Sequence, residues 1–379
     1  MQIDLKQKVY VRPTTEVDLE GVARLWLPRK RDPQTFKWLL SGGGEELRSY
    51  VAVAGDKVVG HIAYVMSDYR YKGKTYKGVF TIEWKVDGGD GKQAALSLYS
   101  KVLKLGDFTF VIGGTDVVAQ IYPHLKFKVP LHVSRFLKVT RPLQYFKALN
   151  NNFLKKIPKT VFYSRNLLLP KLPSRNGDVE LSAYEGNQPN IANDSVVANE
   201  LRNDHVQWLM NAPNLTTYPF TIRRNGKAIG MALCYIQNTG GIITGRIVHV
   251  SSLGEEVDLW RQVVDKLDNF LVEKGCCVIT SMASHPLFEK ALRDNRHVFL
   301  RKSPFWLRDT KKHFTDAAWH LTYLEGDLAY RQIYISDFVP PKTCLKPRCD
   351  VSKLIIPVTG WNILRNLTTD YSDYLGLFL

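Results

Sequence analysis

Residues 50–64, YVAVAGDKVVGHIAY, and residues 219–234, PFTIRRNGKAIGMALC, share a pattern from which the rest of the chain can be interpreted. Each stretch alternates apolar side chains, turns at a glycine and continues as a second apolar run, which is typical of a β-hairpin. The turn Asn225-Gly226 suits a two-residue hairpin well, and Gly55-Asp56 suits it less well. An offset of 170 residues relates three pairs: Trp38 and Trp208, Lys57 and Lys227, and Gly60 and Gly230. This self-similarity indicates a duplicated domain.

Apolar periodicity on either side of the hairpins predicts strands and helices in a similar order in both halves. In the first half we expect strands at 9–12, 50–54, 57–66, 76–86, 108–113 and 127–139, and helices after residue 15 and at 91–104 and 116–124. In the second half we expect strands at 218–223, 227–236, 241–250 and 277–282, and a helix at 255–273. The sequence therefore predicts an α/β fold with two tandem domains, each a mixed central sheet flanked by helices. The predicted division is 1–145 and 180–332 for the domains, 146–179 for a basic connector and 333–379 for a tail.

The net charge of +16 is concentrated in one segment of the 379 residues. No acidic residue lies between Val117 and Gly177, and twelve basic residues do: Lys126, Lys128, Arg135, Lys138, Arg141, Lys147, Lys155, Lys156, Lys159, Arg165, Lys171 and Arg175. Such a field attracts a phosphorylated cofactor, an acidic acyl carrier protein, RNA or an anionic membrane, unless it is simply a solvated face. Within it, residues 135–159 mix aromatic, apolar and basic side chains. That mixture indicates either an amphipathic surface helix that touches a membrane or an acyl carrier, or an interdomain connector.

Composition narrows the class of protein. Hydrophobic residues make up 45% and charged residues 23%, which is ordinary for a globular protein and excludes a wholly disordered one. The start of the chain lacks the apolar region of a signal peptide, and no apolar run approaches the length of a membrane span. Five cysteines do not form a disulfide framework in a chain of this length, so we expect a cytoplasmic protein. Cys344 and Cys349 have no second Cys or His pair nearby, which argues against a metal site.

Residues 79–96, VFTIEWKVDGGDGKQAAL, place a strand before a glycine-rich turn and a helix, and residues 121–127 read IYPHLKF. With the hairpin at 50–64, they resemble the GNAT acyltransferase fold, whose donor-binding turn usually reads V-x-x-x-x-R-G-x-G-x-G/A. The chain departs from that pattern at Asp90 and Gln93, where the family has arginine and glycine. These two departures put donor binding in doubt, because a carboxylate repels a pyrophosphate.

The resemblance covers about residues 8–140 and, more weakly, 180–332, so it implies two tandem GNAT-like domains. The closing residues 319–327, WHLTYLEGD, are similar to the end of tandem GNAT proteins, some of which are encoded in bacterial polysaccharide gene clusters.

The resemblance implies a donor site in the first half for acetyl-CoA or another acyl-CoA. A glycine-rich turn entering a helix offers backbone N–H groups and a favourable dipole to a pyrophosphate, which suits this donor. The residues implied are Trp84, Val86, Gly88, Gly89, Gly91, Lys92, Ala94 and Ala95. For the chemistry, the resemblance implies Tyr122 as the acid that protonates the leaving thiolate, and Glu83 is the nearest candidate for the base. An exposed strand carboxylate and a packing tyrosine are the competing interpretations of these two residues.

The second half lacks the corresponding residues. Its strand at 246–250 enters a helix without a glycine-rich turn, Leu292 occupies the position of Tyr122, and His249 is the residue in the body of that strand suited to proton transfer. We therefore expect a degenerate copy that shapes an acceptor cleft or a homodimer surface.

Three functions stay open from the sequence. The first is an N-acyltransferase that moves an acyl group, expected to be acetyl, from CoA to the amine of a small molecule, glycan, lipid or peptide. The second is a Fem-type transferase that uses aminoacyl-tRNA, and the third is a non-catalytic GNAT-like binding protein.

Overall fold

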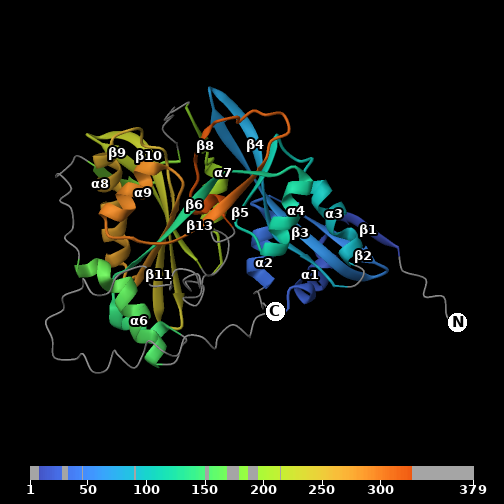
Figure 1. Ribbon diagram of the computed structural model, residues 1–379, viewed down its shortest axis with the longest axis horizontal. Coiled ribbons are helices and arrows are strands. Elements are labelled where there is room, and N and C mark those ends of the chain that lie inside the picture. Colours follow the sequence, from blue (N-terminus) through green and yellow to red (C-terminus); the bar gives the residue numbers. More distant parts are fainter. Residues whose placement is uncertain are drawn as a thin grey trace. The chain divides into compact units, whose positions relative to one another are not determined.

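The computed structural model describes residues 8–27, 33–44, 46–88, 91–149, 153–168, 179–186, 195–213 and 215–326. Met1–Phe338 form one compact unit, and the tail expected at 333–379 lies outside the described residues. Within this unit, helices flank one large mixed sheet, which confirms the predicted α/β class (Figure 1).

The elements of the first half follow the predicted order closely. They are β1 (Val9–Pro13), α1 (Leu19–Leu25), α2 (Pro33–Ser41), β2 (Ser49–Ala54), β3 (Lys57–Tyr71), β4 (Lys74–Val86), α3 (Gly91–Val102), β5 (Phe108–Ile112), α4 (Asp116–Ile121) and β6 (Lys128–Val139). The segment after β6 holds α5 (Pro142–Ala148), α6 (Phe153–Ser164) and the 3-10 helix η3 (Arg165–Leu168). Helical structure therefore occupies much of the stretch that the sequence assigned to a connector.

The second half repeats most of this order, with β8 in the place of α1 and with β14 added after the last shared strand. Its elements are β7 (Val179–Ala183), β8 (Val196–Asn199), α7 (Asn203–Met210), β9 (Thr216–Arg224), β10 (Lys227–Thr239), β11 (Ile242–Val250), α8 (Val257–Glu273), β12 (Val278–Ala283), α9 (Pro286–Asp294), β13 (Val298–Arg308), β14 (Ala318–His320) and the 3-10 helix η4 (Tyr323–Glu325). The elements β1, α2, β3, β5, α4 and β6 begin 170 residues before β7, α7, β10, β12, α9 and β13. The offset found in the hairpins thus relates the two halves element by element.

The two halves do not keep separate sheets, which is where the structure departs from the expectation of one sheet per domain. The strand order is β1-β2-β3-β4-β5-β13-β6-β12-β11-β10-β9-β7. Strand β13 of the second half pairs antiparallel with β5, and β6 of the first half pairs antiparallel with β12. The equivalent strands β6 and β13 are therefore each inserted beside a strand of the other repeat. Sequence periodicity could not show this exchange, because it reports the faces of a strand and not its neighbour.

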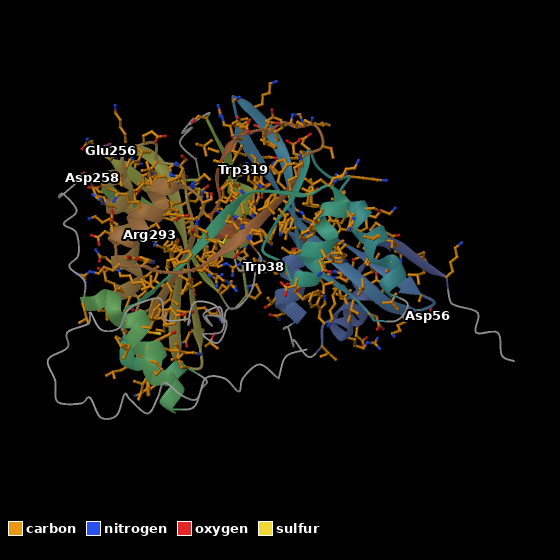
Figure 2. The ribbon with its side chains drawn as sticks, in the orientation of Figure 1. Trp38, Asp56, Glu256, Asp258, Arg293 and Trp319 are labelled. Atoms are coloured by element: carbon orange, nitrogen blue, oxygen red, sulfur yellow. The ribbon has the colours of Figure 1, made fainter. Side chains whose placement is uncertain are left out.

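Trp38, labelled in Figure 2, forms a reciprocal contact with Trp208 where the two halves meet. Their rings stack with centroids 4.9 Å apart. Trp38 Nε1 donates to the carbonyl of Trp208 at 2.8 Å, and Trp208 Nε1 donates to the carbonyl of Trp38 at 3.0 Å. Each tryptophan donates a hydrogen bond to the other and accepts one from it, as equivalent residues do in a two-fold symmetric interface.

The alternation of side chains along β2 separates two apolar layers in the first half. Val51 and Val53 belong to the cluster that receives Val22 of α1 and Leu39 of α2. The intervening residues, Ala52 and Ala54, belong to a cluster on α3 with Leu98, Tyr99 and Tyr122. Successive strand residues point to opposite faces, so α1 and α2 cover one face and α3 the other.

Candidate donor site

Strands β4 and β5 separate before β4 ends. They pair in parallel only between residues 78–80 and residues 108–110. Farther along, Val111 and Ile112 of β5 pair with Trp306 and Phe305 of β13, and β4 continues to Val86 without β5 as a partner. The opening lies at the carboxyl ends of parallel strands, where open α/β sheets bind their ligands.

A β-bulge distorts β4 at the opening. His61 of β3 pairs with Lys85 and Ala63 pairs with Ile82, so Ile62 lies opposite both Glu83 and Trp84. Glu83 has a φ of 53°, which is uncommon for a residue that is not glycine. A bulge leaves backbone groups outside the regular ladder and redirects the following side chains, and bulges are frequent near functional sites.

Aromatic side chains gather on the α3 face of the opening. The Trp84 ring lies 4.7 Å from Tyr99, and Tyr122 lies 5.2 Å from Trp306, centroid to centroid. The Tyr99 hydroxyl is 3.1 Å from Thr81 Oγ1. Burial raises the pKa of Tyr99 to about 12, although hydrogen bonds with Thr81 and Tyr122 oppose that rise. Tyr122 is only 2% exposed, so its hydroxyl lies within this cluster and contacts Tyr99.

The turn between β4 and α3 brings the backbone very close to β3. A Cβ atom at Gly91 would lie 2.2 Å from the carbonyl oxygen of Val59, so only glycine fits at the start of α3. Gly88 is exposed and has no atom within 4 Å of such a position. Gly89, implied as a donor residue, lies outside the described residues, as does Asp90. The glycine at 91 thus has a packing reason that is independent of any ligand.

The structure brings four of the implied residues into one apolar cluster. Ala94 and Tyr122 are buried in it, and Trp84 and Val86 pack against it. Ala95 is half-buried, and Lys92 is the second residue of α3. Glu83 is half-buried at the bulge and is not a member of the cluster. Tyr99 and Trp306 are the cluster members that sequence reasoning missed, and Trp306 arrives only through the exchange of β13.

An open pocket of about 740 Å³ lies beside the turn and is lined by Gly88, by α1 and by the start of β3. Three cations line it, Arg24, Lys57 and Lys85, together with the carboxylates of Asp56 and Asp87. Lys57 Nζ is 2.9 Å from Asp87 Oδ2. Lys85 Nζ lies 5.4 Å from the centroid of the Trp26 ring and donates to the carbonyl of Leu27. The pocket therefore offers cations to a phosphate group, but two carboxylates reduce their field.

In the second half, the chain itself occupies the corresponding opening. Strands β11 and β12 pair from Thr244 and Val278 to Ile247 and Ser281. Beyond Ile247 and Ser281, the segment 318–325 lies against both β11 and β12. Trp319, at the start of this segment, is labelled in Figure 2. Ser284 N donates to the carbonyl of Leu321, and Leu321 N donates to Ser284 Oγ at 2.8 Å.

The start of α8 also differs from that of α3. Glu256 precedes α8 and forms an ion pair with Arg224. A carboxylate therefore lies at the helix N-terminus, where an acyl-CoA donor would place its pyrophosphate.

Histidines around this filled opening are neutral structural groups. His249 Nδ1 is 3.2 Å from Thr322 Oγ1, and burial lowers the pKa of His249 to about 3. His320 Nε2 donates to the carbonyl of Val250 at 2.6 Å, and burial lowers the pKa of His320 to about 4. Both rings are therefore neutral near neutral pH and lack the acidic second proton of an imidazolium, so neither suits general acid catalysis there.

Glu325 is expected to make stability depend on pH. Burial raises the pKa of Glu325 to about 7, although the hydrogen bonds that Thr322 N and Oγ1 donate to its Oε2 lower it. The native chain therefore keeps a proton that the unfolded chain loses between about pH 4.5 and 7, so wild-type stability falls across that window. We expect Glu325→Gln to match the wild type at pH 4.5 and to exceed its free energy of unfolding by about 3 kcal/mol at pH 8. Urea unfolding at both pH values measures this, and a difference that does not change with pH would contradict it.

Within the described ranges, no group of three or more His, Cys, Asp or Glu side chains is arranged to hold a metal ion. Among the same residues, no helix is both long and apolar enough to span a membrane.

Comparison with known proteins shows the fold. No protein-family profile and no curated protein matches the sequence. Among solved structures, a GCN5-related N-acetyltransferase from Anabaena variabilis superposes with a TM-score of 0.50 at 13% identity, covering 79% of this chain and 72% of that chain. The N-myristoyltransferase of Saccharomyces cerevisiae, solved with myristoyl-CoA and inhibitors, gives 0.51 at 11% identity, covering 82% and 81%. At these identities the similarity concerns the fold alone, and the chain has the fold of GNAT acyltransferases.

Proposed function

We propose that the first half binds an acyl-CoA, with acetyl-CoA as the expected donor, and transfers its acyl group to an amine. The observation that carries the proposal is the separation of β4 from β5 next to the glycine that begins α3. This arrangement offers an opening for an extended thioester arm and a helix N-terminus for a pyrophosphate. The acceptor is an amine on a small molecule, glycan, lipid or peptide.

The proposed reaction assigns three roles to the chain. The amine attacks the thioester carbonyl, and backbone N–H groups around the bulge at Trp84–Val86 stabilise the oxyanion that forms. Glu83 takes the proton that the amine loses. The C–S bond then breaks, and Tyr122 protonates the departing thiolate of CoA.

We also propose that the chain arose by duplication, with GNAT-like domains at 1–145 and 180–332 joined by a connector at 146–179. The second copy gave up donor binding when the segment 318–325 entered its opening, and its β13 supplies Trp306 to the aromatic cluster of the first copy. Its role is then to complete the first site and to shape the acceptor side.

Thermal unfolding in the presence of acetyl-CoA, a long-chain acyl-CoA and free CoA tests the proposal. A ligand at about 100 times its Kd stabilises the native state by about 2.7 kcal/mol, so we expect a clear rise in Tm. Gly88 offers a matched pair, because a Cβ atom added at this position would have no atom within 4 Å. Gly88→Asn should keep the shift and Gly88→Asp should lose it, since the two differ only in the charge presented to the pyrophosphate.

The absence of a shift with all three ligands at low salt would contradict a CoA donor. Steeply salt-dependent tRNA binding would then favour the Fem-type alternative, and no binding at all would favour a non-catalytic protein.

A further inference from the structure

The segment formed by α5, α6 and η3 exposes an unusual amount of apolar surface. We call it the α5–η3 surface, and it comprises the described residues 142–149 and 153–168. Leu143 is 80% exposed, Val161 65% and Leu168 89%. The same short segment exposes three further large apolar side chains: Ile157, Phe162 and Leu167. Exposed apolar side chains gathered in one segment of the chain are typical of an interaction site.

The exposed side chains are not needed to attach the helices to the protein. Tyr145, Leu149 and Tyr163 are buried and already join these helices to the core cluster. Ile157 and Val161 are one helical turn apart, so they lie on a common face of α6, and both are exposed. Helix α6 is therefore apolar on a core-facing side and again on a side where Ile157 and Val161 are exposed.

The charge of the same segment is uniformly positive. Between residues 141 and 168 there is no carboxylate, and there are six basic residues: Arg141, Lys147, Lys155, Lys156, Lys159 and Arg165. Lys156 Nζ lies 5.6 Å from the centroid of the Phe146 ring, so a cation and an aromatic ring are presented together. Basic side chains beside exposed aliphatic and aromatic ones are the combination that binds in the headgroup layer of an anionic bilayer.

We propose that the α5–η3 surface docks on an anionic lipid bilayer, with Leu143, Val161 and Leu168 inserted and the lysines against the headgroups. The aliphatic character of the exposed side chains decides against RNA, because single-stranded RNA is bound by aromatic stacking platforms and not by leucine and valine. The absence of any carboxylate favours a continuous negative surface as the partner. The proposal is independent of the acyl-transfer chemistry, since it uses none of the donor-site residues.

Co-sedimentation of the full chain with vesicles tests it. We expect binding to phosphatidylcholine vesicles that contain 30% phosphatidylglycerol, and at least tenfold weaker binding to vesicles of phosphatidylcholine alone or at high salt. Val161→Asp combined with Leu168→Asp should weaken binding at least tenfold. The matched control is Val17→Asp combined with Leu27→Asp, which alters exposed residues of the same types outside the surface and should bind like the wild type. Circular dichroism and Tm of both variants establish that they fold.

Three results would overturn the proposal. The first is no binding to the anionic vesicles, or equal loss in both double variants. The second is retention of binding in Val161→Asp with Leu168→Asp. The third is that the wild type does not bind vesicles and that Val161→Asp with Leu168→Asp alone changes the oligomeric state or loses binding to tRNA or to an acidic carrier protein. Such a result would assign the α5–η3 surface to a second copy, to tRNA or to the carrier protein.

Discussion

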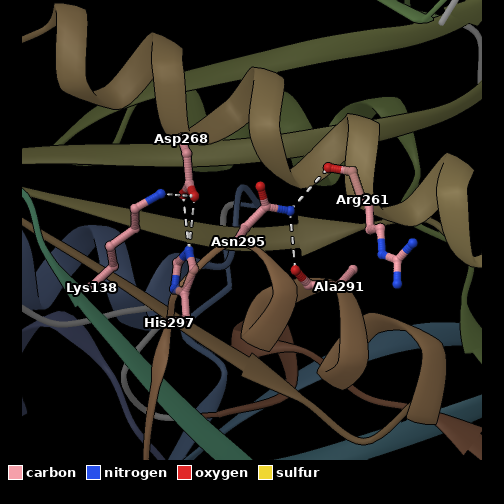
Figure 3. Close-up of polar contacts among 6 residues, drawn as sticks. All are labelled: Lys138, Arg261, Asp268, Ala291, Asn295 and His297. Atoms are coloured by element: carbon pink, nitrogen blue, oxygen red, sulfur yellow. Dashed lines mark hydrogen bonds and ion pairs between the residues drawn. The ribbon is translucent and has the colours of Figure 1, made fainter. Parts of the chain in front are cut away.

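Replacing Asp268 by alanine is expected to lower the free energy of unfolding by about 3–5 kcal/mol, because it leaves buried His297 and partly buried Lys138 without their carboxylate partner. Asp268 lies on α8 and is 1% exposed. Lys138 Nζ of β6 lies 2.6 Å from its Oδ2, and His297 Nε2 lies 3.0 Å from both carboxylate oxygens (Figure 3). Burial raises the pKa of Asp268, but the interactions with His297 and Lys138 more than offset it, so the pKa lies below its ordinary value. The carboxylate thus joins the exchanged strand β6 to the second half.

The repeat supplies the control for this experiment. The residues 170 positions earlier are Leu98 for Asp268 and Phe127 for His297, and both are buried in the apolar cluster on α3. The triple variant Asp268→Leu, His297→Phe, Lys138→Met copies this apolar solution and should recover most of the lost stability, since hydrophobic replacement of a buried ion pair is often neutral. Urea unfolding measures both variants. A loss below about 1 kcal/mol for Asp268→Ala would show that the network contributes little.

Replacing Tyr122 by phenylalanine should lower turnover at least tenfold if its hydroxyl protonates the leaving thiolate. Donor affinity should change little, because the ring that packs on Phe127 and Trp306 is kept. Steady-state rates with the donor identified by thermal shift measure the effect.

Tyr99→Phe is the matched control for Tyr122→Phe. It removes the hydroxyl that Tyr122 contacts and leaves the proposed acid in place. A structural role for the pair would make the two variants lose activity alike. A catalytic role makes the loss in Tyr122→Phe much the larger. An unchanged rate in Tyr122→Phe would remove Tyr122 from the reaction.

The hairpins and the repeat could be predicted because they depend on local chemistry. Asn225 and Gly226 both have positive φ values, 50° and 75°, which the two-residue turn requires and which this dipeptide tolerates. The alternation of apolar residues correctly predicted the first residues of β3 and β10, and Gly91 was correctly predicted as the start of α3. The family resemblance had grouped Trp84, Val86, Ala94 and Tyr122 as site residues; the structure packs them into one apolar cluster, and their roles stay predictions.

The contacts between the halves could not be predicted, because they depend on which strands become neighbours. Nothing in the sequence of β13 shows that it inserts beside β5, so Trp306 was missed as a member of the site. Likewise, Lys138 and Asp268 are 130 residues apart, and only the exchange of β6 brings them together. The filling of the second opening by residues 318–325 also depends on tertiary packing, although the missing glycine turn had already indicated a degenerate copy.

Hydrogen exchange of the full chain with and without free CoA tests most directly whether the donor site lies in the first half. We predict slower exchange at the end of β4 and in the first turn of α3, residues 84–95, and no change in the counterpart at the end of β11 and the start of α8, residues 250–261. Protection at 250–261 instead, or no protection in either segment at a CoA concentration that saturates binding, would contradict a donor site at the separation of β4 and β5.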